Sequence, residues 1–328
     1  MKSKSSSRLK EMSYSVTFVL ILRAHTEMKV INEYAKLKRV ILGSSSSFGG
    51  TPELYAAYDP KSKEHIRKGT FPSQDDVTEE IEGFCKVLKD NGVEVLRPKV
   101  IENYNQIFAR DIAVVIDDKF VIANMIDDRS REIGALAEII SDFSKENIVK
   151  APDGVRFEGG DIMPHNEYIF IGYSEAEDFS TYKVSRTNIE GVEFFKQTFP
   201  LKKVKAFELK KSDTDPKINA LHLDCCFQPF GLGHAIIHKE GFKNPKDAEW
   251  LIDFFGEDNC LIIDSEQMYN MGANLFSIAK NHVISEIGLE QTNSFLESKG
   301  YTINKIKYSE IAKMEGLLRC STLPLERD

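Results

Sequence analysis

Residues 111–149 read DIAVVIDDKFVIANMIDDRSREIGALAEIISDFSKENIV, and they contain one complete supersecondary unit. Two apolar runs, at 112–116 and 120–123, flank a polar turn and predict a β-hairpin. Over 131–143 the apolar residues recur with helical spacing, and an apolar pair at 148–149 starts another strand. The stretch therefore predicts a hairpin, a helix and a strand in that order.

The same order recurs at three later places in the chain, each time with a polar turn between the first two strands. The expected elements are strands at 161–163 and 168–173, a helix at 189–199 and a strand at 204–209; strands at 220–227 and 234–238, a helix at 245–255 and a strand at 260–263; strands at 274–279 and 283–286, a helix at 289–298 and a strand at 301–306.

An earlier, less regular copy begins with a strand at 39–42 and a long polar loop. Ser73 is expected to cap the following helix together with Asp76, and Gly92 suits a left-handed helix end. A strand at 93–96 closes this copy. The chain thus contains five units of roughly 40–60 residues, the size of one supersecondary repeat.

The composition is that of an ordinary soluble globular protein, with 41% hydrophobic and 29% charged residues among 328. The net charge of −8 argues against nucleic acid as a partner, because phosphate binding needs clustered Lys and Arg. The apolar run at 16–22 is too short to cross a membrane. No linker rich in Pro, Gly or Ser divides residues 28–328, so a single domain is expected there.

Residues 1–27 are expected to be a disordered tail, or an addition upstream of a natural start at Met28, and a poor signal peptide is the alternative. The five cysteines are an odd number without a CxxC pair. This argues against a disulfide framework and against a cysteine-rich zinc site. A reducing compartment, and hence the cytoplasm, is the simplest inference.

Four short polar motifs are spread over the chain: NQIFARD at 105–111, FEGGD at 157–161, LHLDCCF at 221–227 and LRCSTLPL at 318–325. Together they supply several carboxylates, a His and a Cys, which can serve as ligands, acid/base and nucleophile. Three motifs fall at the entrances of separate hairpins, and the fourth follows the last unit. Such placement would bring distant residues to a common centre.

The motif LHLDCCF is expected to be a strand, on which alternate side chains share a face. His222, Asp224 and Cys226 would then point one way, and Cys225 would point into the core. A face with His and Asp needs a reason, since buried charge is costly. The alternatives are a satisfied His–Asp pair in a polar core and a metal site made of these three side chains.

Cys320 follows Arg319, and a positive neighbour favours the thiolate, which is the reactive form of cysteine. The alternative for a lone cysteine is a small buried hydrophobe. The two glycines of FEGGD allow a tight bend and a close backbone approach, although its acids could instead form a charged turn. Arg110 and Asp111 could likewise form a surface ion pair.

Together these motifs resemble the guanidine-modifying enzymes, namely arginine deiminase, dimethylarginine dimethylaminohydrolase and amidinotransferase. The resemblance extends from residue 36 to the C-terminus. It implies the pentein fold, an α/β propeller of five pseudo-symmetric ββαβ units around a central site. The five units predicted from periodicity agree with that architecture independently.

The resemblance also implies roles for individual residues. Cys320 would be the nucleophile and His222 the acid/base. Three carboxylates would hold the guanidinium of the substrate: Asp111, Glu158 and Asp224. Charge-assisted hydrogen bonds from the guanidinium N–H groups would hold the substrate in place.

For the rest of the substrate, the resemblance implies that Asn105 and Arg186 bind a carboxylate, with Asp161 as a further binding residue. Arg186 lies in VSRTN at 184–188. The expected partner is a small guanidino compound. Neither nucleic acid nor a membrane is expected as a partner, and the sequence leaves the formation of a homo-oligomer open. No metal or organic cofactor is needed for this chemistry.

The motifs divide between two reactions. FEGGD and RCSTLPL resemble the hydrolases, whereas EIEGFCKVLKDNGVEVLRP at 80–98 resembles the amidinotransferases. A hydrolase of arginine or a substituted arginine is expected, and an amidinotransferase or a non-catalytic pentein binding protein is the alternative. Residues 44–72 and 174–186 are expected to cover the site and to select the substrate.

Overall fold

The computed structural model describes residues 27–328, so the expectations for residues 1–26 lie outside the described part of the chain. The strands of this part form five three-stranded sheets, which confirms the α/β fold of five ββαβ-like units. In each sheet the central strand runs antiparallel to one neighbour and parallel to the other. Among the described helices, none is both long and apolar enough to cross a membrane.

The stretch 111–149 folds in the predicted order of elements. The strands β3 (Ala113–Ile116) and β4 (Lys119–Ile122) form an antiparallel hairpin. The strand β5 (Ile148–Lys150) returns parallel to β4 after the helical segment. This crossover places the helical segment on one side of the sheet, which is the arrangement that the other units repeat.

The single helix expected in this unit is instead two short helices, α3 (Arg131–Ala135) and α4 (Ala137–Ser141). They meet at Leu136, whose backbone leaves the helical region. The carbonyl of Ala135 is taken by the backbone N–H of Lys99, a residue outside the helix. A tertiary hydrogen bond therefore breaks a segment that periodicity alone predicts as continuous.

Three later units repeat the arrangement and confirm the predicted order of elements, although the strand predicted at 220–227 is instead the later strand β9 (Phe227–Phe230). Their elements are β6 (Ile162–His165), β7 (Tyr168–Tyr173), α6 (Ile189–Thr198) and β8 (Lys203–Glu208); β9 (Phe227–Phe230), β10 (His234–Ile237), α8 (Pro245–Phe255) and β11 (Cys260–Ile262); β12 (Phe276–Ala279), β13 (His282–Glu286), α10 (Glu290–Ser298) and β14 (Thr302–Ile306).

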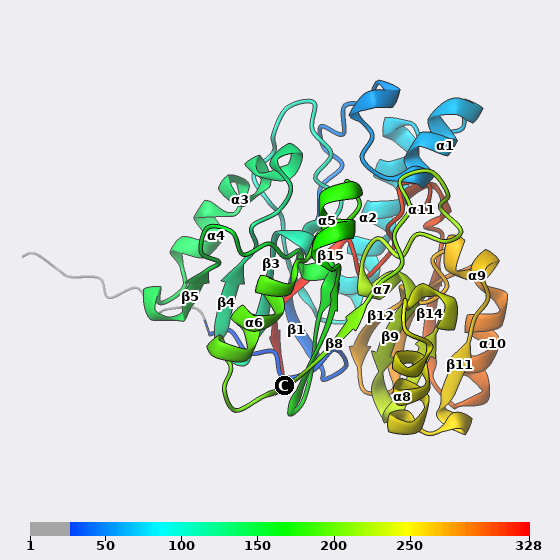
Figure 1. Ribbon diagram of the computed structural model, residues 1–328. Helices are drawn as coiled ribbons and strands as arrows, with labels where there is room; N and C mark the ends of the chain where they lie inside the picture. The colour runs from blue at the N-terminus through cyan, green and yellow to red at the C-terminus, as the bar shows by residue number, and fades with distance from the viewer. Residues whose placement is uncertain (1–26) are drawn as a thin grey trace, which may run out of the picture.

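The first unit is completed by a strand from the far end of the chain. The strand β1 (Leu37–Leu42) pairs in parallel with β2 (Glu94–Leu96) and antiparallel with β15 (Thr322–Arg327). In Figure 1 the red β15 lies beside the blue β1. Sequence reasoning missed β15, because the segment after Cys320 shows no hairpin signal and its partner strand is distant in sequence.

The helix of the first unit, α2 (Gln74–Asp90), has the expected ends. The Ser73 hydroxyl accepts from the Asp76 N–H, and the Asp76 carboxylate accepts from the Ser73 N–H. Gly92 follows the helix with φ of 76°, as a left-handed stop requires. The remaining helices are short connections: α1 (Pro60–Lys68), α5 (Ala176–Thr181), α7 (Leu223–Cys226), α9 (Ser265–Tyr269) and α11 (Ser309–Ala312).

Three of the polar motifs form helical turns just before the first strand of their unit. Ala109–Ile112 and Gly159–Asp161 are 3₁₀ turns, and Leu223–Cys226 is the one-turn helix α7. The strands expected to contain these residues therefore begin later than predicted. As a result, each motif lies at an edge of its sheet, where its side chains can reach the centre of the molecule.

The prediction that His222, Asp224 and Cys226 share one face of a strand is wrong. Residues 223–226 are helical because the Asp161 carboxylate, from the preceding unit, accepts the Leu223 N–H at 2.9 Å and fixes the start of the turn. Cys226 points into an apolar core instead of toward Asp224. The alternative of a metal site made of His222, Asp224 and Cys226 is therefore wrong as well.

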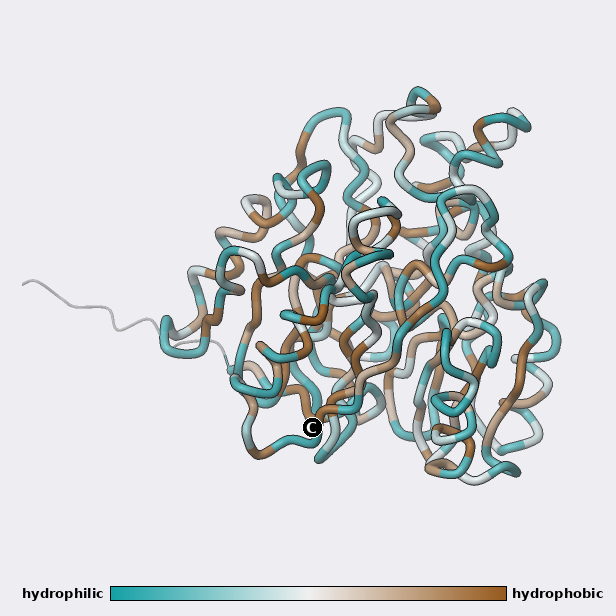
Figure 2. The backbone as a smooth tube through the Cα atoms, in the orientation of Figure 1, coloured by the Kyte–Doolittle hydropathy of each residue, from teal (hydrophilic) through white to brown (hydrophobic). Residues whose placement is uncertain are grey.

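The apolar cores lie between the sheets and the surrounding helices. Figure 2 shows the hydrophobic segments concentrated along the strands inside the molecule, whereas the peripheral helices and loops are largely hydrophilic. Neighbouring units contact one another through their first strands, as β15 does with β3, and through the turns that precede these strands. The centre is therefore where polar side chains from different units can gather.

Candidate active site

The polar turns of the second, third and fourth units converge at the centre of the molecule. Gly160 lies so close to its neighbours that a Cβ there would come within 2.7 Å of the His222 ring and 2.9 Å of Asp111 Oδ1. A Cβ on Gly159 would come within 2.1 Å of the Arg110 carbonyl oxygen. The two glycines of FEGGD are thus required for the close approach that brings these turns together.

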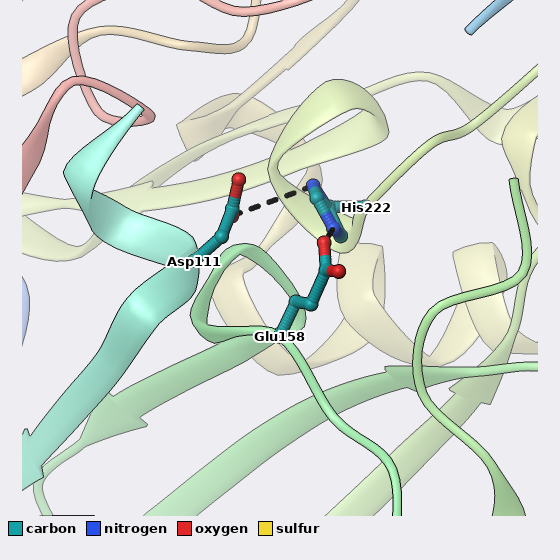
Figure 3. Close-up of side chains that lie close together, drawn as sticks. All are labelled: Asp111, Glu158 and His222. Atoms are coloured by element: carbon teal, nitrogen blue, oxygen red, sulfur yellow. Dashed lines mark hydrogen bonds and ion pairs between the residues drawn. The ribbon is translucent and has the colours of Figure 1, made fainter. Parts of the chain in front are cut away.

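His222 lies between two carboxylates at this junction, as Figure 3 shows. Its Nε2 is 2.9 Å from Glu158 Oε2, and its Nδ1 is 3.7 Å from Asp111 Oδ1. Burial lowers the pKa of His222, but the two carboxylates raise it more, so the pKa lies above its ordinary value. The carboxylates therefore favour the charged form of the imidazole.

Two arginines neutralise these acids. Arg186 Nη1 donates to Glu158 Oε2 at 2.9 Å, and Arg129 donates to Asp111 Oδ2. Arg129 also forms a two-pronged pair with Glu132, at 2.7 and 2.9 Å. The interpretation of Asp111 as part of a surface ion pair is wrong, because it is only 3% exposed.

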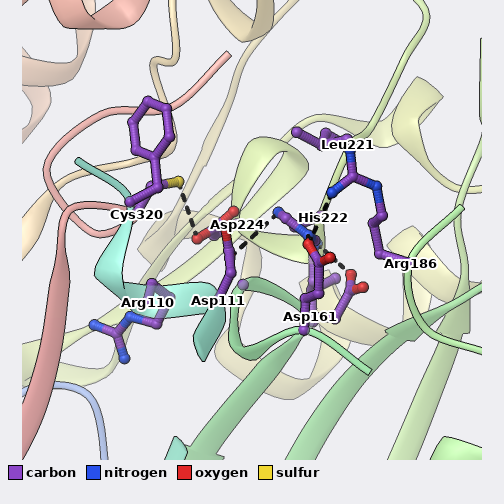
Figure 4. Close-up of polar contacts among 12 residues, drawn as sticks. Arg110, Asp111, Asp161, Arg186, Leu221, His222, Asp224 and Cys320 are labelled. Carbon is purple, nitrogen blue, oxygen red and sulfur yellow. Dashed lines mark hydrogen bonds and ion pairs between the residues drawn. The ribbon is translucent and has the colours of Figure 1, made fainter. Parts of the chain in front are cut away.

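Cys320 lies on the other side of Asp111, in the segment that leads into β15 (Figure 4). Its Sγ is 3.5 Å from Asp224 Oδ2 and accepts from Asn274 Nδ2 at 3.1 Å. The Asn274 side-chain oxygen accepts from the backbone N–H groups of Arg319 and Cys320. Asn274 therefore holds the thiol and its backbone in one position.

Arg319 does not activate Cys320 in the way that the sequence suggested. Its guanidinium turns inward, donating to Asp224 Oδ2 at 2.7 Å and to both oxygens of Glu33. Burial and the carboxylates of Asp224 and Asp111 raise the pKa of the Cys320 thiol well above its ordinary value, against a smaller lowering by Arg319. The thiol is thus protonated in the free protein.

The central ion cluster extends from Arg319 to the start of the described chain. Glu33 is buried, and the neighbouring arginines lower its pKa to about 2 although burial opposes the shift. Arg110 is 2% exposed and bonds the Arg319 carbonyl at 3.2 Å. Arg110 and Glu33 thus help to hold the loop that contains Cys320 in place.

A cavity of about 300 Å³ opens onto this junction. Of the residues predicted for the site, Asn105, Asp111, Arg186, His222 and Cys320 line it. The structure places the other three behind this wall, fully buried: Glu158, Asp161 and Asp224. Residues 48–62 form much of the opposite wall, in line with the expected covering loop, whereas Arg186 alone represents the expected segment 174–186.

Asp161, predicted to bind substrate, has both oxygens engaged within the protein. Oδ2 accepts from the Thr187 hydroxyl at 2.6 Å, and Oδ1 accepts from the Leu223 N–H at 2.9 Å. Its pKa is raised by burial. Asp161 therefore connects the FEGGD turn to the turn that carries His222.

Four buried polar atoms near the cavity have no hydrogen-bond partner among residues 27–328: Asp111 Oδ1, Asp224 Oδ1, Arg186 Nη2 and Glu315 Oε2. An unpartnered buried polar atom is costly unless a ligand or water completes it. The first two can accept from a cation, and the third can donate to an anion. The cavity thus offers complementary groups to a molecule that carries both charges.

Asp111, Glu158 and His222 place ligand atoms within 4.8 Å of one another, which is a spacing that a metal ion could bridge. Their electrostatic surroundings oppose this use. Arg129 and Arg186 already donate to the two carboxylates, and the raised pKa of His222 favours its charged form. A histidine binds a metal ion through a neutral imidazole nitrogen, and a carboxylate binds it through a free lone pair. This cluster therefore suits proton transfer better than metal binding.

Four contributors to the site escaped sequence reasoning: Glu33, Arg129, Asn274 and Glu315. None lies in a polar motif at a hairpin entrance. Asp127, Asp128 and Arg129 follow a strand and precede a helix, which is an ordinary composition for a loop. The signal for these residues is a tertiary contact, and sequence periodicity does not contain it.

These features define a class. The chain belongs to the guanidine-modifying pentein superfamily. It shares with that superfamily the fold of five units and a central site lined by carboxylates, a His and a Cys. Within that superfamily, residues 51–327 match the family described as "N,N dimethylarginine dimethylhydrolase, eukaryotic", and the chain is a member of that family.

Curated proteins similar to this chain include an uncharacterised protein and an arginine deiminase. An uncharacterised protein of Bacillus subtilis, YkgA, is 27% identical over 247 residues, which are 74% of this chain and 78% of the relative. An arginine deiminase of Listeria monocytogenes is 28% identical over 259 residues, covering 68% of this chain but 62% of the deiminase. The chain therefore matches less than two thirds of that deiminase's length.

Solved structures share the fold. An amidinotransferase of saxitoxin biosynthesis from Microseira wollei, SxtG, superposes with a TM-score of 0.71 at 18% identity, covering 92% of this chain and 97% of that one. The N-terminal domain of the cyanobacterial arginine dihydrolase ArgZ gives a TM-score of 0.71 at 16% identity, over 89% of this chain and 98% of that one. These similarities concern the fold alone.

Proposed function

We propose that the protein is a cysteine-dependent hydrolase that breaks a C–N bond at the guanidinium carbon of arginine or a substituted arginine. The observation that carries the proposal is the single cavity lined by Cys320, His222, Asp111 and Arg186. It combines a thiol, a charged imidazole and a carboxylate with an arginine that can receive a substrate carboxylate.

Binding of the substrate uses the unpartnered atoms of the site. Asp111 Oδ1 and Asp224 Oδ1 are free to accept from the guanidinium N–H groups, as charge-assisted hydrogen bonds. Arg186 Nη2 and the Asn105 side chain take the carboxylate of the same molecule. Two fixed points of opposite charge orient the guanidinium carbon toward Cys320.

Arrival of the cationic substrate lowers the pKa of the Cys320 thiol, since a positive charge near sulfur favours the thiolate. The thiol proton passes to Asp224 Oδ2, which lies 3.5 Å from Sγ. The thiolate then adds to the guanidinium carbon and forms a tetrahedral adduct. No thiolate is required before substrate binds.

His222 transfers the remaining protons. In its charged form it donates a proton to the leaving nitrogen, which departs as an amine or ammonia and leaves an amidino-thioether on Cys320. Neutral His222 then takes a proton from water, the resulting hydroxide adds to the amidino carbon and displaces the thiolate, and Asp224 returns its proton to Sγ. Glu158 orients His222 and favours its charged form. It does not hold the guanidinium directly, because the two Glu158 oxygens accept from Ile126, Arg186 and His222.

The same proposal covers the organisation of the chain. The cavity takes side chains from four of the five units, so we treat residues 28–328 as one catalytic domain. The five cysteines, all within the described residues, are free of disulfides. Free thiols including the nucleophile support placement in the reducing cytoplasm.

Product analysis tests the proposed reaction. The full chain is incubated with arginine and with methylated arginines, with and without glycine as an amine acceptor, and Cys320→Ser serves as the control. Citrulline formed without an acceptor, and abolished by Cys320→Ser, is the expected result. Turnover that requires the acceptor and yields ornithine would replace the hydrolase by an amidinotransferase. Absence of turnover and of labelling of Cys320 by a haloacetamidine would leave a binding protein.

A further inference from the structure

Two carboxylates meet in the cavity wall at a place that the proposed reaction does not use. Asp59 comes from the loop that precedes α1, and Glu315 comes from the segment that precedes Cys320. Both are 4% exposed, and both line the cavity. The two side chains lie within hydrogen-bonding reach of each other, although two carboxylates without a proton or cation between them repel.

The fold holds the two acids in this arrangement from both sides. Asp59 caps α1, with Oδ1 accepting from the Ser62 N–H at 2.6 Å. Glu315 Oε1 accepts from Asn219 Nδ2 at 2.6 Å. Glu315 also has φ of 58°, in the left-handed region that residues with a side chain seldom adopt. Backbone strain of this kind gathers at ligand sites, where it fixes the direction of a side chain.

Among residues 27–328 no Lys, Arg or His forms an ion pair with either acid of this pair. Glu315 Oε2 is buried and has no hydrogen-bond partner among the described residues. The charge of Lys61 acts on both acids and lowers the pKa of Glu315, but its ammonium donates to the carbonyl of Tyr269. Within residues 27–328 no ion pair joins Lys61 to either acid. Apart from the Asp59 carboxyl, Glu315 Oε2 therefore has no polar partner within the described residues.

Protonation is the state that the free protein adopts instead. Burial and the Asp59 carboxylate raise the pKa of Glu315 well above its ordinary value. A proton shared by two acids relieves their repulsion, and so would a bound cation with several N–H donors. A primary ammonium has three donors and fits two acceptors that face one cavity.

We propose that Asp59 and Glu315 bind a primary ammonium group in the active-site cavity, in addition to the guanidinium held beside Cys320. This inference rests on the proposed function, because it names a second recognition element of the same cavity. The ammonium has two sources: the guanidino substrate itself, as in the α-amino group of arginine, or a separate amine that accepts the amidino group. Both supply the same chemistry to the pair.

The test compares arginine with 5-guanidinopentanoate, which is arginine without its amino group. It uses the wild type, Asp59→Asn and Glu315→Gln, with Glu53→Gln as the matched control, since Glu53 is exposed on the same loop. We expect each site variant to lower kcat/KM for arginine about tenfold or more and to leave that for 5-guanidinopentanoate within about twofold. Equal losses for both substrates would mean a structural role and overturn the proposal.

A second arm identifies the source of the ammonium. If the wild type handles both substrates equally, putrescine is titrated at fixed arginine. Saturable acceleration, with a KM for putrescine that rises in Glu315→Gln, assigns the site to an acceptor amine. Absence of both discrimination and acceleration overturns the ammonium site while the hydrolase proposal stands.

The two proposals can fail separately. If no guanidino compound is turned over, agmatine binding to the wild type and to both site variants is measured by titration calorimetry. Binding that Asp59→Asn and Glu315→Gln each weaken retains the ammonium site without the hydrolase. Absence of agmatine binding, or equal binding to all forms, rejects it.

Discussion

The surroundings of Cys320 and His222 favour the protonated form of both side chains, for different electrostatic reasons. Burial and two carboxylates raise the pKa of the Cys320 thiol well above its ordinary value. The carboxylates beside His222 raise its pKa despite burial. The surroundings thus favour a thiol at Cys320 and an imidazolium at His222. A cation has to enter the cavity before the thiolate becomes favourable.

The alkylation rate of Cys320 tests this assignment. We expect the rate with neutral iodoacetamide to rise with pH and not to level off by about pH 9, because the raised pKa moves thiolate formation to higher pH. A cationic haloacetamidine should react much faster at neutral pH. Mass spectrometry locates the label, and Cys320→Ser is the control.

A plateau near neutral pH would contradict the assignment, since it would mean a thiolate–imidazolium pair in the free protein. Equal rates for the neutral and cationic reagents at neutral pH would contradict the role of the entering charge.

Sequence reasoning placed Cys320, His222 and Asp111 in one site because each stands in a polar motif among apolar strands. It could not place Glu33 or Asn274. Glu33 acts through Arg319, which is 286 positions away, and Asn274 acts through the backbone of the Cys320 loop. Such roles exist only after folding, so neither composition nor spacing reveals them.

At the scale of the elements, Gly160 in the turn before β6 determines how closely the motifs approach. Gly160→Ala would place a Cβ within 2.7 Å of His222 and 2.9 Å of Asp111, so one of them has to move. We expect kcat/KM to fall about a hundredfold, because a displacement of that size misaligns the reacting groups. Circular dichroism should show retained secondary structure.

Gly134→Ala is the matched control for this change. Gly134 lies in α3, and a Cβ there meets nothing within 4 Å. Alanine is the better helix former, so the free energy of unfolding should rise by about 0.5–1 kcal/mol with activity unchanged. Full activity of Gly160→Ala would show that the turns have more freedom than their spacing implies.

Elements with strong periodicity were predictable, and elements set by tertiary hydrogen bonds were not. The helices α2 and α8 match their predicted extents because caps and apolar stripes are local signals. The turn at α7 depends on a carboxylate from another unit, and the break between α3 and α4 depends on Lys99. Because the apolar runs begin within these turns, the prediction started the first strands of the units too early in the chain.

At the scale of the whole molecule, β15 joins the last segment to the first unit. Leu325 in β15 is fully buried, so Leu325→Ala should lower the free energy of unfolding by about 2–5 kcal/mol. Leu201→Ala is the control, because Leu201 is 95% exposed and should change it by no more than about 0.5 kcal/mol. Urea unfolding measures both variants.

Similar small effects of the two substitutions would show that β15 contributes little to the closure of the five units. A large effect of Leu325→Ala with an unchanged urea dependence would confirm that closure contributes to global stability.

Pairing of β1 with β15 also has a consequence for the order of events during synthesis. β1 is made early, and its neighbour β15 follows only after all the other sheets, so one edge of β1 waits unpaired for most of translation. Cys320 lies directly before β15 and reaches its acids only when that edge is filled. A partly made chain therefore exposes an unpaired strand edge, and the contacts of Cys320 with Asp224 and Asn274 form only when the last strand is in place.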